Sequence, residues 1–523
     1  MKNTANQNKP TQGQNSRART AAESLIDDVL GSDAVLFHDQ FDNAYLAWHG
    51  DGRQILKLDN REFTRWLAHR YWTKVQKPLP READKQVVQT LSSFACDKDG
   101  QSHDLYVRLA KKDNTLYYDL ANGSVVEITS SRWKVVSNPT IMFRRMQQKP
   151  QVLPEQNGEL GLLRSYVNVA SDDDWLLFMV FTVAAFITDF PHPLLVLHGP
   201  QGSGKTTPMK VIKQLVDPSV IQGMVLPDKP VEFVQLADHH AFLFFDNLSG
   251  MSIKMSDALA RAVTGDTFSK RRLYTDNDDV VYKIQSPMAI NGINQVISKP
   301  DLLDRAILIE FQRIAQEDRI PEDEFWEAFT HDKPQLLGAI FDVLVEAMSI
   351  YPTVPSENLP RMADFSRWGC AIAEAAGYKQ EDFLNAYASN IERQNDEAID
   401  ASPIAKAVIG LLEDCEDGTW QGSPESLLGT LNRRLDTINS SSSPLWPKSP
   451  ELLSRKLRDA QVNLQAIGIQ VDFGRNSRGR FIVLTKTNDD SVESNEPDET
   501  APYEPQQQLP VGKDKDVTMS VKS

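Results

Sequence analysis

The first patterned stretch, from about residue 30 to 155, mixes short alternating segments with helical ones. Residues 44–58 alternate around a His-Gly-Asp-Gly turn and predict a β-hairpin, whereas residues 61–72 place aromatic and aliphatic side chains along one helical face. Residues 104–136 predict an antiparallel meander with turns at Lys-Asp-Asn and Asn-Gly. The pattern favours an α+β unit, and the proline-containing segment 150–154 ends it.

Beyond this unit, residues 156–315 alternate helical and strand patterns in the order of a parallel nucleotide-binding sheet. The most apolar run, Trp175–Ile187, is too short to span a bilayer and follows Ser-Asp-Asp-Asp, which predicts a capped, buried helix. Helical spacing dominates from about 320 to 415. Residues 423–486 then predict helix, helix, strand, turn and strand, the outline of a winged helix.

Composition narrows the class of protein. The 523 residues, 41% of them hydrophobic, suit several globular domains. The cysteines, Cys96, Cys370 and Cys415, lack metal-site spacing, which favours a reducing compartment without a zinc site. Residues 1–24 contain no Leu, Ile, Val or Phe, so we expect no secretory signal there. A net charge of −16 argues against coating nucleic acid with the whole surface, so any such contact must be local.

One segment has the chemistry of a phosphate-binding loop. It follows the apolar strand pattern of 194–198 and precedes a helical one, the context in which glycines, a lysine and a threonine bind a triphosphate. The glycines let backbone N–H groups face the phosphates, Lys205 reaches the outer phosphates, and Thr206 can bind Mg²⁺. The predicted nucleotide-binding residues are Gly199, Pro200, Gln201, Gly202, Ser203, Gly204, Lys205, Thr206 and Thr207.

Three later positions extend this site. Asp246 ends the apolar run Phe-Leu-Phe-Phe, where a carboxylate at the end of a parallel strand would hold Mg²⁺. Asn291 ends the next strand pattern and could orient the attacking water, although asparagine also forms turns. Arg305 lies between a short helix and another strand, where it either forms an ordinary salt bridge or reaches a neighbouring subunit's nucleotide.

The order of these motifs resembles the core of superfamily 3 helicases, especially the primase-helicases of phages, poxviruses and bacterial integrative elements. The resemblance covers about 160–315 and implies an α/β fold with an AAA+-like P-loop ATPase core. The flanking units resemble those of the mobile-element members more loosely. By this resemblance Lys205, Thr206 and Asp246 bind Mg-ATP, Asn291 is a polar sensor, and Arg305 acts in trans within a ring, usually a hexamer.

Basic residues mark two candidate DNA contacts. By the same resemblance Lys270, Arg271 and Arg272 stand beside a hairpin that contacts single-stranded DNA, although its tip, Thr-Asp-Asn-Asp-Asp, is acidic. Residues 448–486 carry more basic than acidic groups, which suits either duplex DNA or a solvated surface. The candidates in this second segment are Arg455, Lys456, Arg458, Arg475, Arg478 and Arg480.

The position after Asp246 departs from the helicase pattern. That position commonly bears a water-activating carboxylate, but here it is Asn247, whose amide cannot accept a proton. Asp266 is one alternative acid. Slow hydrolysis is the other reading, and it fits a nucleotide-gated switch at least as well as a motor.

The leading hypothesis is an ATP-dependent, ring-forming DNA helicase or translocase that replicates a mobile element or prophage in the bacterial cytoplasm. It would use ATP and Mg²⁺ and bind single- and double-stranded DNA. Its protein partners would be its own copies and, as further candidates, replication or primase proteins, and it would not bind membranes. A nucleotide-gated initiator with little hydrolysis is the alternative, and a small-molecule kinase fits less well. The expected domains are 1–25 disordered, 26–155 α+β, 156–315 ATPase, 316–416 helical, 417–486 winged-helix-like and 487–523 a disordered acidic tail.

Overall fold

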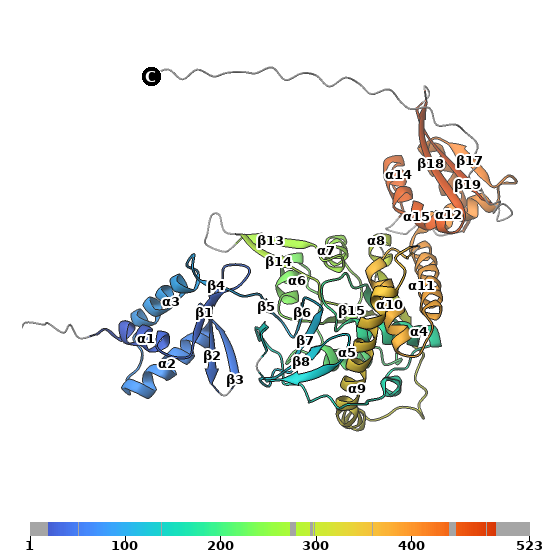
Figure 1. Ribbon diagram of the computed structural model, residues 1–523. Coiled ribbons are helices and arrows are strands. Elements are labelled where there is room, and N and C mark those ends of the chain that lie inside the picture. The colour runs from blue at the N-terminus through green and yellow to red at the C-terminus, as the bar shows by residue number, and fades with distance from the viewer. Residues whose placement is uncertain are drawn as a thin grey trace, which may run out of the picture.

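The computed structural model shows three packed units along the chain (Figure 1). It describes residues 19–50, 52–137, 139–271, 279–292, 297, 299–357, 359–438, 446–476 and 479–487. The N-terminal unit contains α1 (Ala21–Leu30), β1 (Val35–His38), β2 (Ala44–Gly50), β3 (Gly52–Lys57), α2 (Arg61–Val75), α3 (Arg81–Ala95) and β4 (Gln101–Ser102). Its sheet has the order β3-β2-β1-β4, and its helices bury Leu25, Phe63 and Leu91 against that sheet.

The start of α1 differs from the sequence expectation. The helix begins at Ala21, inside the segment expected to be disordered up to residue 25. Thr20 and Glu23 form a reciprocal capping box, in which each side chain accepts a hydrogen bond from the other's backbone N–H, at 3.2 and 2.8 Å. Leu25 and Val29 then attach the helix to the N-terminal core.

Phe63 and Tyr71 of α2 are core residues and Trp66 is half-buried against them, as the helical spacing predicts, whereas Trp72 is exposed. The ring centroid of Trp66 lies 5.9 Å from that of Trp48 and 5.7 Å from that of Phe63, and Arg70 covers the ring at 5.1 Å. Neighbouring side chains thus occupy the surfaces that a base-stacking platform would leave open.

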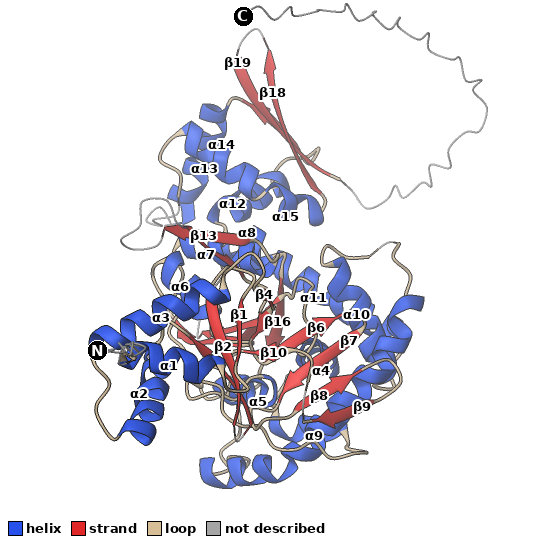
Figure 2. Ribbon diagram, turned by 60° about the vertical axis from the view of Figure 1, so that its left-hand side comes forward, coloured by secondary structure: helices blue, strands red, loops and turns tan. Residues whose placement is uncertain are grey.

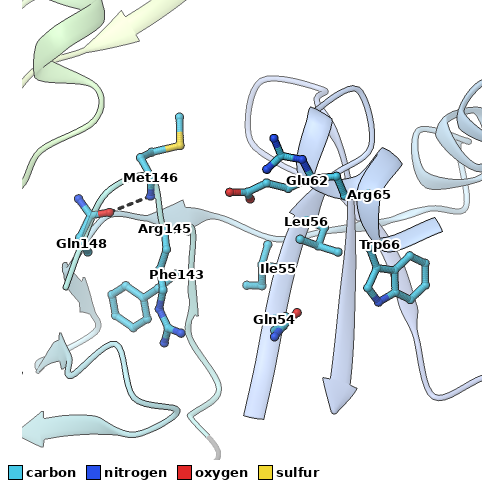
Figure 3. A pocket seen from close by; sticks show the side chains of 10 residues that line it. All are labelled: Gln54, Ile55, Leu56, Glu62, Arg65, Trp66, Phe143, Arg145, Met146 and Gln148. Atoms are coloured by element: carbon cyan, nitrogen blue, oxygen red, sulfur yellow. Dashed lines mark hydrogen bonds between the residues drawn. The ribbon is translucent and has the colours of Figure 1, made fainter. Parts of the chain in front are cut away.

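A pocket of about 440 Å³ lies between this unit and the chain around β10 (Met142–Phe143), and both contribute residues to its lining. Figure 3 shows Ile55 and Arg65 on one side and Phe143 and Met146 on the other. Beside the pocket, Phe37, Tyr45 and Ala47 pack on Met142 and on Leu105 of β5 (Leu105–Tyr106). This cluster joins the N-terminal unit to the central one.

The predicted meander is present, but its buried face belongs to the central unit. Its strands are β6 (Leu109–Lys112), β7 (Thr115–Asp119), β8 (Val125–Ile128) and β9 (Trp133–Val136), paired antiparallel in sequence order. Tyr118 and Trp133 pack on Phe341, at ring distances of 5.7 Å each. The central core therefore begins near Leu109, well before the boundary expected at residue 155.

The central unit is built on a parallel sheet, as predicted. The strands β11 (Leu194–His198), β12 (Leu243–Leu248), β15 (Met288–Gly292) and β16 (Ala306–Glu310) pair in the order β12-β15-β11-β16. Around the sheet lie η1 (Leu160–Tyr166), α4 (Asp172–Ala184), α5 (Thr206–Val216), α6 (Pro230–Ala237), α7 (Ile253–Val263) and α8 (Pro300–Leu303). The run expected to form a buried helix is α4, whose side chains from Asp174 to Ala184 are buried and whose cap is Ser171.

A hairpin projects from the central unit beside α7 (Figure 1). It consists of β13 (Thr267–Arg271) and β14 (Asp279–Lys283), paired antiparallel. Lys270 and Arg271 belong to β13, whereas Arg272 and the acidic tip up to residue 278 lie outside the described residues.

The predicted helical region is α9 (Glu322–Ile350), η2 (Tyr351–Thr353), α10 (Ala363–Ala375) and α11 (Gln380–Ala401). The segment Glu322–Thr353 is long and apolar enough to cross a membrane by length and composition alone. Leu336, Ile340 and Leu344 of α9 are buried in the central core. The apolar character of α9 is therefore that of a core helix.

The C-terminal unit packs at the end of α11 (Figure 2). It contains α12 (Pro403–Glu413), β17 (Thr419–Gly422), α13 (Pro424–Ile438), α14 (Pro450–Asp459), α15 (Gln461–Ala466), β18 (Ile469–Asn476) and β19 (Gly479–Lys486). The strands pair antiparallel in the order β17-β19-β18. The helix, helix, strand, turn and strand predicted from the sequence are present, with α12 and β17 preceding them.

Candidate nucleotide-binding site

The loop between β11 and α5 takes a shape that only glycines allow at low cost. Gly199, Gly202 and Gly204 have φ angles of 141°, 81° and 74°, in the region that residues with a side chain rarely adopt. At Gly199 a Cβ atom would also lie 2.3 Å from the carbonyl oxygen of Phe311. The glycines predicted from the sequence are therefore required by the backbone.

Lys205 is held by its own loop. Its ammonium group donates to the carbonyl oxygens of Gly199 and Pro200 at 2.8 and 2.9 Å and to the hydroxyl of Ser203 at 3.1 Å. Burial lowers the pKa of Lys205 from its ordinary value. A triphosphate in the loop would replace these neutral acceptors with anionic ones and favour the charged ammonium.

Three predicted side chains meet at the carboxyl end of the sheet. The Thr206 hydroxyl donates to the Asp246 carboxylate at 2.9 Å, and the Asn291 amide lies 3.5 Å from the same hydroxyl. Asn291 is buried and accepts a hydrogen bond from the backbone N–H of Asn247 at 2.6 Å. A hydroxyl and a carboxylate beside a phosphate loop are the oxygen donors that Mg²⁺ prefers, so Thr206 and Asp246 fit a magnesium site.

The backbone explains why asparagine suits position 247. Asn247 has a φ of 56°, and the pairing register shifts between Phe245 and Leu248. Asparagine is among the few residues that tolerate this left-handed conformation, which glutamate disfavours. The Asn247 side chain is exposed, so its structural contribution here is the turn and the N–H that binds Asn291.

Arg305 does not join the site of its own chain. It directly precedes β16, and its carbonyl accepts from Leu194 at the start of β11, the end of the sheet opposite the loop. Its guanidinium pairs with Asp301 at 2.7 Å. Within one chain Arg305 forms the salt bridge that the sequence left open as an alternative, and contact with a nucleotide would require a second copy.

The segment after β16, which the sequence patterns do not single out, lies against the phosphate loop. Ile314 donates its N–H to the carbonyl of Gly202 at 3.3 Å. The Nη2 atom of the exposed Arg319 lies 3.7 Å from the position that a Cβ would take at Gly202. Arg319 is thus a second cation beside the loop, and an arginine just before a helix carries no motif that would have identified it.

The far end of α5 is anchored in the central core. Gln151 donates to the carbonyls of Gln214 and Leu215 at 3.0 and 3.1 Å, and the Tyr118 hydroxyl donates to Leu215 at 2.7 Å. The buried Arg108 donates to the carbonyl of Pro218 at 2.8 Å. The bonds to Gln214 and Leu215 supply partners for carbonyls that the end of α5 leaves without one.

A buried ion pair strengthens this anchor. Lys213 and Asp217, both with side chains 0% exposed, are 2.7 Å apart, and Lys213 also donates to the carbonyl of Phe242 at 2.7 Å. Burial by itself would raise the pKa of Asp217, but the charge of Lys213 and the neighbouring His240 and Arg108 hold that pKa well below its ordinary value. Asp217 is therefore an anion in the folded protein.

The basic residues of the C-terminal unit lie on α14 and on the β18–β19 hairpin. Arg455 and Arg458 are exposed, Lys456 is half-buried, and Arg458 lies over the ring of Phe473 in β18 at 4.5 Å. Arg475 and Arg480 are exposed and directly opposite each other across the hairpin. Arg478 lies outside the described residues. The Arg458–Phe473 contact brings α14 and the hairpin together.

Two protein-family models match parts of the chain. Residues 160–397 match the model for the actinomycete integrative conjugative element replication protein, and residues 404–500 match the model for the C-terminal domain of AICE RepA. A search of curated proteins finds no match. Neither family match tests the resemblance to superfamily 3 helicases, which stays a prediction.

Similar solved structures include SCCmec type IV Cch, described as an active helicase, and the apo C-terminal region of NrS-1. Cch is 11% identical over 86% of this chain and 92% of its own, with a TM-score of 0.43. The NrS-1 region is 10% identical over 88% and 98%, with a TM-score of 0.41. Over residues 160–397 and 404–500 the chain thus resembles the RepA replication proteins of actinomycete integrative conjugative elements.

Proposed function

We propose that this replication protein is an ATP-driven DNA helicase or translocase whose copies assemble into a ring, acting on its mobile element in the bacterial cytoplasm. One observation carries the proposal. Thr206, Asp246 and Asn291, distant in sequence, converge by hydrogen bonding beside the glycine loop that holds Lys205. A triphosphate, its metal and an attacking water need these chemical groups in this proximity.

Each side chain has a separate task in this proposal. Lys205 would turn from its loop carbonyls to the outer phosphates, while Thr206 and Asp246 would hold Mg²⁺, which neutralises phosphate charge when bound. Asn291 would orient the attacking water through its amide. Arg305 of a neighbouring copy would stabilise the charge that develops on the γ-phosphate, so hydrolysis would depend on assembly.

ATP turnover and assembly mass test this function directly. We expect steady-state hydrolysis at about 1 s⁻¹ or faster when single-stranded DNA is present, since ordinary enzymes work at such rates. Native mass measurement with ATP should show a homo-oligomer. A protein that stays monomeric and hydrolyses no ATP with or without DNA would contradict the proposal.

Asn247 supports a second candidate, a nucleotide-gated initiator that binds ATP and hardly hydrolyses it. Its amide accepts no proton, and its backbone N–H is bound to Asn291, which would couple β12 to the occupied site. Turnover below about one per minute together with tight ATP binding would favour this switch over a motor.

The C-terminal unit would hold duplex DNA. Its order of helix, strand, three helices and a two-stranded hairpin supports the winged helix expected from the sequence, and Arg455 on α14 and Arg475 on the hairpin are exposed cations. Such cations bind phosphates and release counterions, which makes affinity depend on salt.

Replacing both cations should therefore change the salt dependence of duplex binding. For Arg455→Ala with Arg475→Ala, we expect the slope of log affinity against log salt to become shallower by about 2, roughly one for each lost phosphate contact. Fluorescence anisotropy with a labelled duplex at several salt concentrations measures this slope. Lys406→Ala is the control, because exposed Lys406 of α12 pairs with Asp400 at 2.8 Å. An unchanged slope in the double variant would place the duplex elsewhere.

A further inference from the structure

The site described so far lacks a group that can accept the proton of the attacking water. Asp246 is hydrogen-bonded to Thr206 as a magnesium ligand would be, and Asn291 and Asn247 offer only amides. Hydrolysis of a phosphoanhydride is helped by a carboxylate within reach of the water. The surroundings of Asp246 show where such a carboxylate stands.

A pocket of about 200 Å³ opens beside Asp246 and Asn247. Its other wall comes from the segment before α6, which includes Asp228. Met224 fixes this segment to the free edge of β12, because its N–H donates to Phe244 at 3.2 Å and its carbonyl accepts from Asp246 at 3.0 Å. The pocket has room for several water molecules, each of which takes about 30 Å³ in the liquid.

Two other acids in the central unit are already engaged. Asp266, the alternative suggested by the sequence, is held by Arg261 at 2.6 Å and by the N–H of Thr267 at 2.7 Å. Asp174 is buried against Arg393 at 2.8 Å. Neither of them lines the pocket.

Asp228 differs from these acids in being free. It is exposed, and among the residues that the structure describes it makes no hydrogen bond or ion pair. The adjacent Lys229 does not neutralise it, because Lys229 pairs with Glu232 at 3.1 Å. Asp228 therefore presents an available carboxylate to the pocket that Asp246 and Asn247 also line.

We propose that Asp228 is the catalytic residue that accepts the proton of the attacking water, the task that Asn247 cannot perform; this rests on the ATP hydrolysis proposed above. The water oxygen forms a bond to the γ-phosphorus while the bond from that phosphorus to the bridging oxygen of ADP breaks. The proton of the water passes to the Asp228 carboxylate and from there to solvent, leaving ADP and phosphate. No oxidant or further reactant is needed.

The test separates proton transfer from nucleotide binding. For Asp228→Asn we expect kcat for ATP to fall by about 100-fold or more, the usual contribution of a general base, with the affinity for a fluorescent non-hydrolysable ATP analogue changed by less than about threefold. For Asp228→Ala, added formate should restore part of the lost rate, because a small carboxylate can enter the vacated space. Asp173→Asn, which changes an exposed acid in the first turn of α4 that does not line the pocket, is the control and should keep the wild-type rate.

The outcomes are distinct. If wild type hydrolyses ATP and Asp228→Asn keeps about a third of its rate or more, the assignment of Asp228 is wrong while the ATPase function stands. If the rate falls only as far as nucleotide affinity falls, and formate has no effect, Asp228 binds nucleotide or metal and is not the proton acceptor. If wild type fails to hydrolyse ATP under any condition, the proposed function fails first and the role of Asp228 fails with it.

Discussion

Lys205→Ala should lower kcat/KM for ATP by about 1,000-fold, the largest functional effect expected of a single substitution in this chain. The ammonium group hydrogen-bonds to Gly199, Pro200 and Ser203, so it is placed to transfer to the outer phosphates. Steady-state phosphate release measures the loss. Duplex binding through the C-terminal unit should persist, because Arg455 and Arg475 lie on the surface of a unit with its own core.

Lys210→Ala is the matched control for this prediction. Lys210 lies on the same helix, α5, and its contact is a solvent-accessible ion pair with Glu322 at 3.6 Å. Such pairs contribute little, so ATP turnover should stay within about twofold of wild type. Equal losses in both variants, or full activity in Lys205→Ala, would show that the glycine loop is not the nucleotide site.

Asp217→Asn should cost about 3–5 kcal/mol of unfolding free energy, the largest stability effect that we expect. The substitution leaves the buried Lys213 ammonium without its anion. It also removes the negative charge that lies 3.5 Å from Arg108. Urea unfolding at pH 7, followed by circular dichroism, measures the change. The control is Asp400→Asn, which removes an exposed partner of Lys406 and should change stability by less than about 0.5 kcal/mol.

The pH dependence of this difference provides a second test. The folded-state pKa of Asp217 lies below its ordinary value, so its contribution is fully present above the ordinary carboxyl pKa of about 4 and declines as the pH falls below that value. The difference in unfolding free energy between wild type and Asp217→Asn should therefore be constant from pH 5 to 7 and become smaller below about pH 4. A gap that stays constant through that acidic range would mean that the charge of Asp217 is not what stabilises the fold.

Local sequence signals predicted most of the secondary structure around the site. The apolar runs that became β11 and β12 have side chains buried on both faces of a parallel sheet, and that is why they lack alternation. The phosphate loop was predictable because positive φ angles restrict Gly199, Gly202 and Gly204 to glycine. The meeting of Asp246 and Asn291 followed from both ending neighbouring parallel strands.

Long-range packing was not predictable from these signals. The sequence pattern assigns the meander to the N-terminal unit because its turns are local. In the structure, however, Trp133 donates a hydrogen bond to Asp342 of α9 at 2.7 Å, across more than two hundred residues. Asp228 and Arg319 reach the site through loops that have no periodic pattern. The left-handed turn at Asn247 likewise depends on a register shift that only the assembled sheet shows.

The anchoring of α5 connects the meander to the phosphate loop. The helix spans 11 residues, about 16 Å, from Thr206 at the phosphate loop to the carbonyls held by Gln151 and Tyr118. In the proposed cycle, a shift of Thr206 on phosphate release would pass along α5 to Tyr118, whose ring packs on Phe341 of α9. The sheet that carries Tyr118 would then move with the phosphate loop.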